Sequence, residues 1–82
     1  MIKVGVDVGL RQYAVCRQVD GSLQEPPRMK TPEGFKVWLM EQRALARRVV
    51  VCYEAGLFGF ELARWVVAAG MECLVMAPVR LD

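Results

Sequence analysis

Residues 48–54, RVVVCYE, decide the fold that we expect for this chain. The run is apolar without interruption and ends in one carboxylate, which is typical of a strand covered on both faces in a parallel sheet. A parallel strand reaches its neighbour through a crossover, and helical patterns stand on both sides of this run. The sequence therefore predicts an α/β domain.

Two strands and a hairpin turn open the chain. Residues 2–9, IKVGVDVG, alternate β-branched residues with polar or small ones, which is the period of a strand. Residues 13–19 predict a second strand, and Asp20-Gly21 predicts a hairpin turn because glycine readily adopts a positive φ.

A third strand and a first helix follow. Residues 22–29 predict a strand at a sheet edge, because Pro26 and Pro27 cannot donate ladder hydrogen bonds. Thr31 and Pro32 predict the N-cap and the first position of a helix. The expected buried stripe of this helix consists of Phe35, Trp38, Leu39, Gln42, Leu45 and Ala46.

A second helix and a last strand complete the pattern. Residues 57–70 predict a helix that is apolar nearly all round and ends with Gly70 at the C′ position. Residues 73–78 predict the last strand, which Pro78 ends. The expected main stripe of the second helix consists of Phe58, Leu62, Trp65, Val66 and Ala69, with Phe60 and Val67 facing elsewhere. The element order is therefore βββαβαβ in one domain over residues 1–82.

Composition excludes several kinds of active site. The chain has no His, and Ser22 and Thr31 are its only serine and threonine, which excludes Ser–His–Asp and Cys–His catalysis and His-containing metal sites. Cys16, Cys52 and Cys73 form no CxxC pair and lie in apolar runs, so we expect core residues in a reducing compartment. The net charge of +2 is too small to indicate a nucleic-acid-binding protein by itself.

Hydrophobic residues make up 55% of the 82 residues, which is more than a domain of this size easily buries. We interpret this surplus as a sign of a fragment or of one half of an interface, with poor solubility or self-association. Apolar runs are far shorter than the roughly 20 residues of a membrane span, so we expect no membrane segment. No secretory signal opens the chain, and we expect a cytoplasmic protein.

Two carboxylates are expected side by side at one edge of the sheet. Crossovers are right-handed, so the simplest topology makes strand 2–9 central, with strand 48–54 parallel beside it and the last strand beyond. Ligands of such sheets gather at the carboxyl ends of the strands, where Asp7 and Glu54 stand. At about 5 Å, two like charges repel by roughly 3 kcal/mol at an effective dielectric of 20, so the site raises one pKa or takes up a cation. Oxygen ligands indicate Mg²⁺ or Mn²⁺.

Structural roles explain the same two carboxylates equally well at this point. Asp7 is then a turn-forming residue before Gly9. Glu54 is then an ion-pair partner for Arg11, or an acidic residue near the N-terminus of the following helix.

Two segments resemble known families. VGVDVGLRQYAVCRQVDG, residues 4–21, resembles the opening of ribonuclease-H-like nucleases, and equally the phosphate-binding turn of sugar kinases and actin-like ATPases. CYEAGLFGFELARWVVAAGMECLVMAP, residues 52–78, resembles DEDD-type transposases of bacterial insertion sequences, also called bridge-RNA-guided recombinases. The second resemblance extends over about residues 2–81 and implies a RuvC-like, ribonuclease-H-like mixed sheet that is incomplete at its C-terminus.

The transposase resemblance implies roles for single residues. Asp7 and Glu54 match the family's first catalytic Asp and its Glu, which bind Mg²⁺ beside the scissile phosphate. Gly56 and Gly59 match positions where the chain turns tightly after the Glu, and Pro78 matches the proline that ends the last strand.

The chain departs from the family in its other catalytic groups. The family carries two further catalytic Asp residues and a second domain with a serine nucleophile. Ser22 lies far along the chain from either acid, and Asp82 lacks the paired-aspartate setting. We therefore expect an N-terminal transposase fragment that binds Mg²⁺ weakly and does not cut DNA alone.

The partners implied by the resemblance are DNA and a structured guide RNA, which full-length members of the family use in DNA transposition and recombination. We expect the fragment to retain weak nucleic-acid affinity through four basic residues, Arg11, Arg17, Lys30 and Arg80.

Two alternative functions follow from the same residues. The chain is a non-catalytic interaction module that pairs with a full-length transposase and inhibits its assembly, or an ATP-binding fragment of the actin-like and sugar-kinase class. The ATP-binding class usually places Gly and Thr or Ser directly after its DxG motif, whereas Leu10, Arg11 and Gln12 stand there in this chain.

Overall fold

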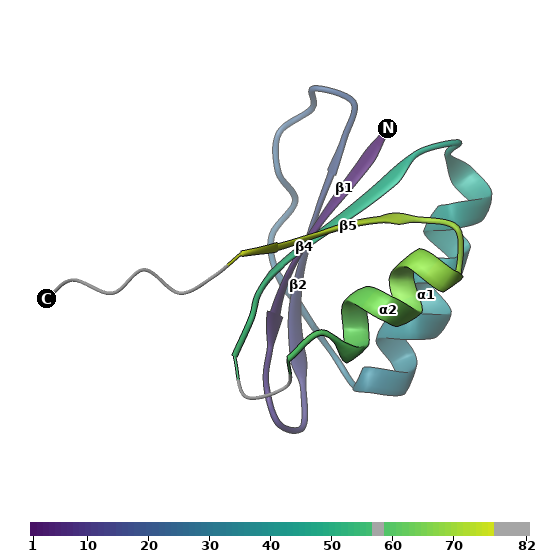
Figure 1. Ribbon diagram of the computed structural model, residues 1–82. Coiled ribbons are helices and arrows are strands. Elements are labelled where there is room, and N and C mark those ends of the chain that lie inside the picture. Colours follow the sequence, from purple (N-terminus) through teal and green to yellow (C-terminus); the bar gives the residue numbers. More distant parts are fainter. Residues whose placement is uncertain (57–58, 77–82) are drawn as a thin grey trace, which may run out of the picture.

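The computed structural model describes residues 1–56 and 59–76 and shows a small α/β domain (Figure 1). Its strands are Ile2–Val8 (β1), Tyr13–Val19 (β2), Arg28–Lys30 (β3), Val49–Glu54 (β4) and Glu72–Met76 (β5). Its helices are Pro32–Leu45 (α1) and Glu61–Ala68 (α2). The predicted order of strands and helices is confirmed. Four residues named from the sequence, Phe58, Pro78, Arg80 and Asp82, lie outside the described residues.

The five strands form one mixed sheet in the order β3-β2-β1-β4-β5. β2 is antiparallel to both β1 and β3, whereas β4 is parallel to both β1 and β5. The central position of β1, the parallel placement of β4 and β5, and the edge position of the third strand were all predicted and are confirmed.

Two elements begin four or more residues later than predicted. β3 begins at Arg28, not at residue 22, because Pro26 and Pro27 precede it and lack the amide donors that a ladder needs. Helix α2 begins at Glu61, not at residue 57, because Gly59 has a φ of 59°, which is outside the right-handed helical region.

Helix α1 begins where the sequence predicts. It ends at Leu45, so Ala46, the last residue of the expected buried stripe, lies outside the helix. The Thr31 hydroxyl accepts a hydrogen bond from the Gly34 amide at 3.0 Å, which caps the helix. The prediction that Leu45 is buried is wrong, because the helix ends there and Leu45 is 70% exposed. Ala46, in an extended conformation, packs against the core instead.

Both helices lie on one side of the sheet, and the core fills the layer between them (Figure 1). Alternate residues of β1 and β4 face this layer together with residues of both helices. The core consists of Ile2, Val4, Val6, Val15, Phe35, Leu39, Val49, Val51, Tyr53, Leu62, Val66 and Met71. Within the described residues, no helix covers the opposite side, which we call the open face. On this face of β4, Val50 is 8% exposed, Cys52 is half-buried and Glu54 is exposed, so the expected burial of both faces is found only at the start of the strand.

The surplus of apolar residues is visible on the surface. Phe60, the N-cap residue of α2, and Val67 on the helix are 57% and 61% exposed, and Leu74 and Met76 on β5 are 59% and 53% exposed. The expectation that Phe60 and Val67 face away from the main stripe of the second helix is confirmed. Neither of the described helices has the length and apolarity that crossing a membrane requires.

Candidate metal site at the carboxyl ends of β1 and β4

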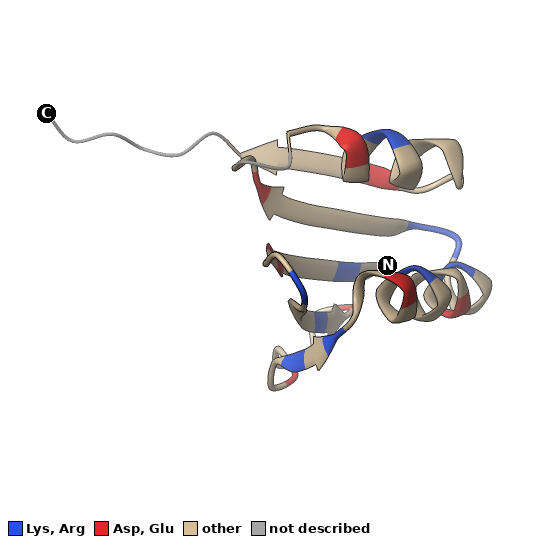
Figure 2. Ribbon diagram, turned by 90° about the horizontal axis from the view of Figure 1, so that it is seen from below, with Lys and Arg blue, Asp and Glu red and all other residues tan. Residues whose placement is uncertain are grey.

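Asp7 and Glu54 lie at the same end of neighbouring parallel strands. Figure 2 shows acidic residues at this end of the sheet. The register pairs Gly5 with Cys52 and Val6 with Tyr53, so one further step along both strands brings Asp7 opposite Glu54. Neighbouring strands are about 4.8 Å apart, and residues opposite each other in a parallel pair project to the same face. The structure therefore places the two carboxylates side by side, as the topology predicted.

Solvent weakens the repulsion between these two carboxylates. Both residues are exposed. At about 5 Å, two unit charges repel by about 0.8 kcal/mol in bulk water, against roughly 3 kcal/mol at a dielectric of 20. The repulsion calculated with a dielectric of 20 is therefore too high for this exposed pair. No ion pair within residues 1–56 and 59–76 involves either group, so the predicted pairing of Glu54 with Arg11 is not observed.

The chemistry of this donor set suits a hard divalent cation. Two adjacent carboxylates offer only oxygen, which Mg²⁺ and Mn²⁺ prefer, and neither carboxylate takes part in an ion pair within the described residues. The described part of the chain contains no cluster of three or more candidate ligands. Asp7 and Glu54 could therefore supply two of about six coordination positions, with water in most of the others.

The turn after Asp7 has a structural explanation of its own. The Gly9 amide donates a hydrogen bond to the Gln12 carbonyl at 3.1 Å, and this bond closes the connection from β1 to β2. A side chain at position 9 would place its Cβ 2.5 Å from that carbonyl oxygen, so the turn requires glycine. Because this amide is engaged, the DxG motif offers one donor fewer to a phosphate.

Three of the four basic residues proposed for nucleic-acid binding are described, and these three do not form one surface. Arg11 is exposed in the connection next to Asp7. Arg17 lies on the helix side, where it donates to Glu25 at 2.8 Å and to Gln42 at 2.9 Å. The Lys30 ammonium lies 5.1 Å from the centre of the Trp38 ring. Arg80 is outside the described residues, so only Arg11 is placed near the carboxylates.

A cavity of about 120 Å³ lies on the helix side of the same sheet end. Its lining includes Tyr13, Lys36, Tyr53 and Glu61. Burial, followed by the nearby Glu33 carboxylate, raises the pKa of the Tyr13 hydroxyl above its ordinary value of 10.0. Tyr13 therefore stays protonated at neutral pH and could donate a hydrogen bond into this cavity.

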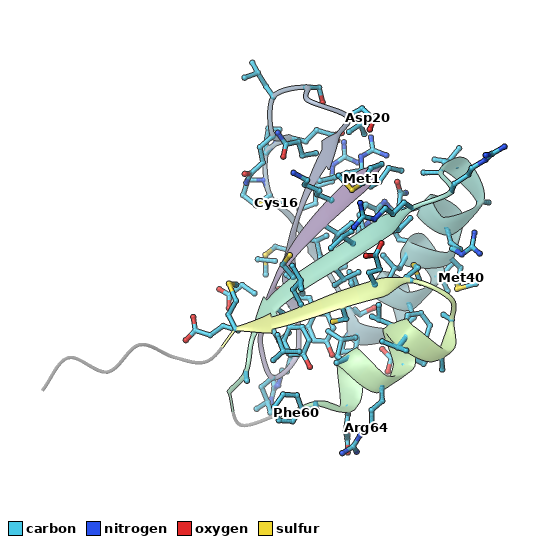
Figure 3. All side chains as sticks on the ribbon, turned by 45° about the horizontal axis from the view of Figure 1, so that its top comes forward. Met1, Cys16, Asp20, Met40, Phe60 and Arg64 are labelled. Atoms are coloured by element: carbon cyan, nitrogen blue, oxygen red, sulfur yellow. The ribbon has the colours of Figure 1, made fainter. Side chains whose placement is uncertain are left out.

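Lys3 and the two cysteines nearest to it form a further group of residues with functional potential, which the sequence patterns do not indicate. Lys3, Gly5 and Asp7 share one face of β1, and Cys16 and Cys52 flank Gly5 on the neighbouring strands. Figure 3 shows Cys16 on the side of the sheet away from the helices. The expectation that all three cysteines are core residues is wrong for Cys16 and Cys52, which are half-buried on the open face. The period-two alternation of residues 2–9 was the signal that could have placed Lys3 there.

Comparisons of the chain with protein-family models, with curated proteins and with solved structures find no match.

Proposed function

We propose that this chain carries the first two metal-binding acids of a ribonuclease-H-like, RuvC-like domain from a DEDD-type transposase. The observation that carries the proposal is the placement of Asp7 and Glu54 at the ends of β1 and β4, side by side and outside the ion pairs of the described residues. The sheet order β3-β2-β1-β4-β5, with an antiparallel start and a parallel finish, supports it. The resemblance of residues 4–21 and 52–78 supplies the family.

The role of the two carboxylates would be to hold Mg²⁺ or Mn²⁺ against a scissile phosphate of DNA. Two carboxylates leave most coordination positions to water, so we expect an affinity in the millimolar range. Catalysis of strand exchange requires further acids and a nucleophile, which the family provides elsewhere. We therefore expect this chain to bind metal weakly and to leave DNA uncut when it acts alone.

Paramagnetic broadening of backbone amide signals by Mn²⁺ tests this proposal directly. We expect Mn²⁺ to broaden signals at the ends of β1 and β4 first, and Asp7→Asn or Glu54→Gln to abolish that selectivity. Glu33→Gln, which removes an exposed acid from the first turn of α1, is the matched control and should leave the pattern unchanged. Broadening centred elsewhere, or unaffected by Asp7→Asn, would refute the site.

The genomic context tests the family separately from the metal. Sequencing of the DNA downstream of this coding region should show a closely spaced pair of Asp codons, in frame or after one frameshift. Absence of such a pair would count against a transposase origin while leaving a metal site at Asp7 and Glu54 open to the first experiment.

An ATP-binding function has less support from the geometry. The Gly9 amide already donates to Gln12, and the residues that follow are Leu10 and Arg11, not the small hydroxyl residues of that class. This alternative predicts that millimolar ATP with Mg²⁺ raises the melting temperature of the chain. An unchanged melting temperature would exclude it.

A further inference from the structure

The open face of the sheet carries an apolar row that crosses four strands. The registers of β2, β1, β4 and β5 align Cys16, Gly5, Cys52 and Leu74 side by side. Leu74 is 59% exposed, and a hollow of about 200 Å³ is lined by Gly5 and both cysteines. A Cβ built on Gly5 would meet no atom within 4 Å, so this part of the face is open.

Opposite charges lie on the two sides of this row. Lys3 lies at the amino-terminal end of β1, and Asp7 lies on the same face about 13 Å further along the strand, with Glu54 beside it. The other charged groups near Lys3 are paired with one another: Arg48 donates to Glu72 at 2.9 Å, and the Met1 ammonium pairs with Asp20. In the described chain, Lys3 takes part in no ion pair, and neither do the two carboxylates.

This charge pattern distinguishes between two ways of packing the face against its own copy. A two-fold axis parallel to the strands would place the carboxylates of one copy opposite those of the other, which is repulsive. A two-fold axis that runs across the strands, along the apolar row, places Lys3 opposite Asp7 of the second copy and Leu74 opposite its own counterpart. Facing sheets lie about 10 Å apart, a gap that a lysine and an aspartate side chain can bridge together.

We propose that a second copy of this chain docks on the open face about this second axis, with two symmetry-related ion pairs between Lys3 and Asp7 around the shared apolar row. The proposal goes beyond the proposed function, because it needs no metal and no nucleic acid. It uses the same carboxylate for a different purpose, so Lys3 of a second copy and Mg²⁺ are alternative counter-charges for Asp7.

The size of the face predicts a weak dimer. Five strands about 4.8 Å apart and five residues of about 3.3 Å each give a projected area of about 400 Å² for each copy. The sum for two copies, about 800 Å², is below the roughly 1,000 Å² of stable interfaces, so we expect a transient association at high protein concentration.

Charge exchange between Lys3 and Asp7 tests the dimer by sedimentation velocity. We expect wild type to show a concentration-dependent dimer and Lys3→Glu or Asp7→Lys to weaken it about tenfold, because each change turns two attractive pairs into repulsive ones. The double variant Lys3→Glu/Asp7→Lys restores both pairs in reversed polarity and should return to within about threefold of wild type. Lys36→Glu, on the helix side, is the matched charge control and should leave the dimer unchanged.

The outcomes separate this proposal from the metal proposal. A wild type that stays monomeric at every concentration, a double variant that does not recover, or an equal loss in Lys36→Glu overturns the dimer. The double variant lacks the Asp7 ligand, so recovery of its dimer without Mn²⁺ broadening at β1 supports docking independently of metal. Mg²⁺ at matched ionic strength should dissociate the wild-type dimer and leave that of the double variant intact.

Discussion

The Tyr53 hydroxyl accepts a hydrogen bond from the Ala63 amide at 3.2 Å and donates one to the Gly59 carbonyl at 3.0 Å. Ala63 is at the third position of α2, where an N-cap side chain normally accepts. The N-cap residue of this helix is Phe60, which has no such acceptor. A strand residue adjacent to Glu54 therefore caps α2, and the candidate metal site is tied to the helix that follows it.

Tyr53→Phe tests this cap. Tyr53 is 2% exposed, and loss of its hydroxyl leaves the part-buried Ala63 amide and Gly59 carbonyl without this partner, so we expect a decrease of about 1–2 kcal/mol in the free energy of unfolding. Phe60→Ser supplies a hydroxyl at the N-cap position and should recover part of this loss in the double variant. Urea denaturation measures both, and a double variant no more stable than Tyr53→Phe would contradict the assigned cap.

The cap explains one limit of prediction from sequence. Alternating or apolar runs in the sequence predict the positions of β1, β2, β4 and β5, and Thr31-Pro32 predicts the start of α1 correctly. The sequence misplaces the start of α2 because Gly59, which has a positive φ, lies within the apolar run, and because the capping group comes from β4 and not from the preceding residues. A contact between separate elements leaves no local signal in the sequence.

Substitution of Arg17 tests whether this basic residue stabilises the fold through its hydrogen bond to Gln42. Its guanidinium donates at 2.9 Å to Gln42, which is 3% exposed on the buried side of α1. Arg17→Leu should lower the free energy of unfolding by about 1–3 kcal/mol, because it leaves a buried amide oxygen without a donor. Replacing both residues with Leu should recover much of this loss. Arg11→Leu, at an exposed position, is the control and should change stability by less than about 0.5 kcal/mol. Equal effects of the two single changes would contradict the buried network.

Two glycines allow a comparison of the same substitution in different surroundings: Gly5 lies on β1, and Gly9 follows the end of that strand. A methyl group at Gly9 would lie 2.5 Å from the Gln12 carbonyl oxygen, so we expect Gly9→Ala to lower the free energy of unfolding by about 1–3 kcal/mol. Gly5→Ala meets open space and restricts the unfolded chain, so it should raise stability by about 0.4–1 kcal/mol. Thermal denaturation compares the two. Tolerance of Gly9→Ala would show that the turn does not need glycine and would restore the phosphate-binding interpretation.

The sequence predicts which residues meet at the candidate site, but it does not predict how exposed these residues are. The order of crossovers is enough to bring Asp7 and Glu54 together, since right-handed connections leave little choice of topology. Their exposure was not predictable, because it depends on which face both helices cover. The same uncertainty explains why Cys16 and Cys52 were placed in the core: their strands are apolar, and alternation alone does not reveal which face stays open.

Cys73 gives a pH-dependent prediction. Burial raises the pKa of its thiol above the ordinary value of 9.0, and the neighbouring Cys52 adds to the effect. A raised thiol pKa favours the neutral form in the folded state, so this contribution to stability is complete below pH 9 and decreases as the pH rises further. In a Cys16→Ser/Cys52→Ser variant, alkylation by iodoacetamide at pH 8 should be slower than that of glutathione and equal to it in urea. Alkylation of the folded variant as fast as that of glutathione would contradict the burial.

Asp7 and Glu54 allow a test by non-additivity. Either Asp7→Asn or Glu54→Gln removes the whole repulsion between the two charges, so each should stabilise the fold by at most about 0.8 kcal/mol, and the double variant should gain no more than the better single one. Salt at 1 M should reduce all three gains by screening. Glu41→Gln, an exposed acid on α1, is the control and should be nearly neutral. A clear loss of stability in Asp7→Asn would instead show that Asp7 forms the turn before Gly9, because only a structural role makes the carboxylate favourable in the absence of a cation.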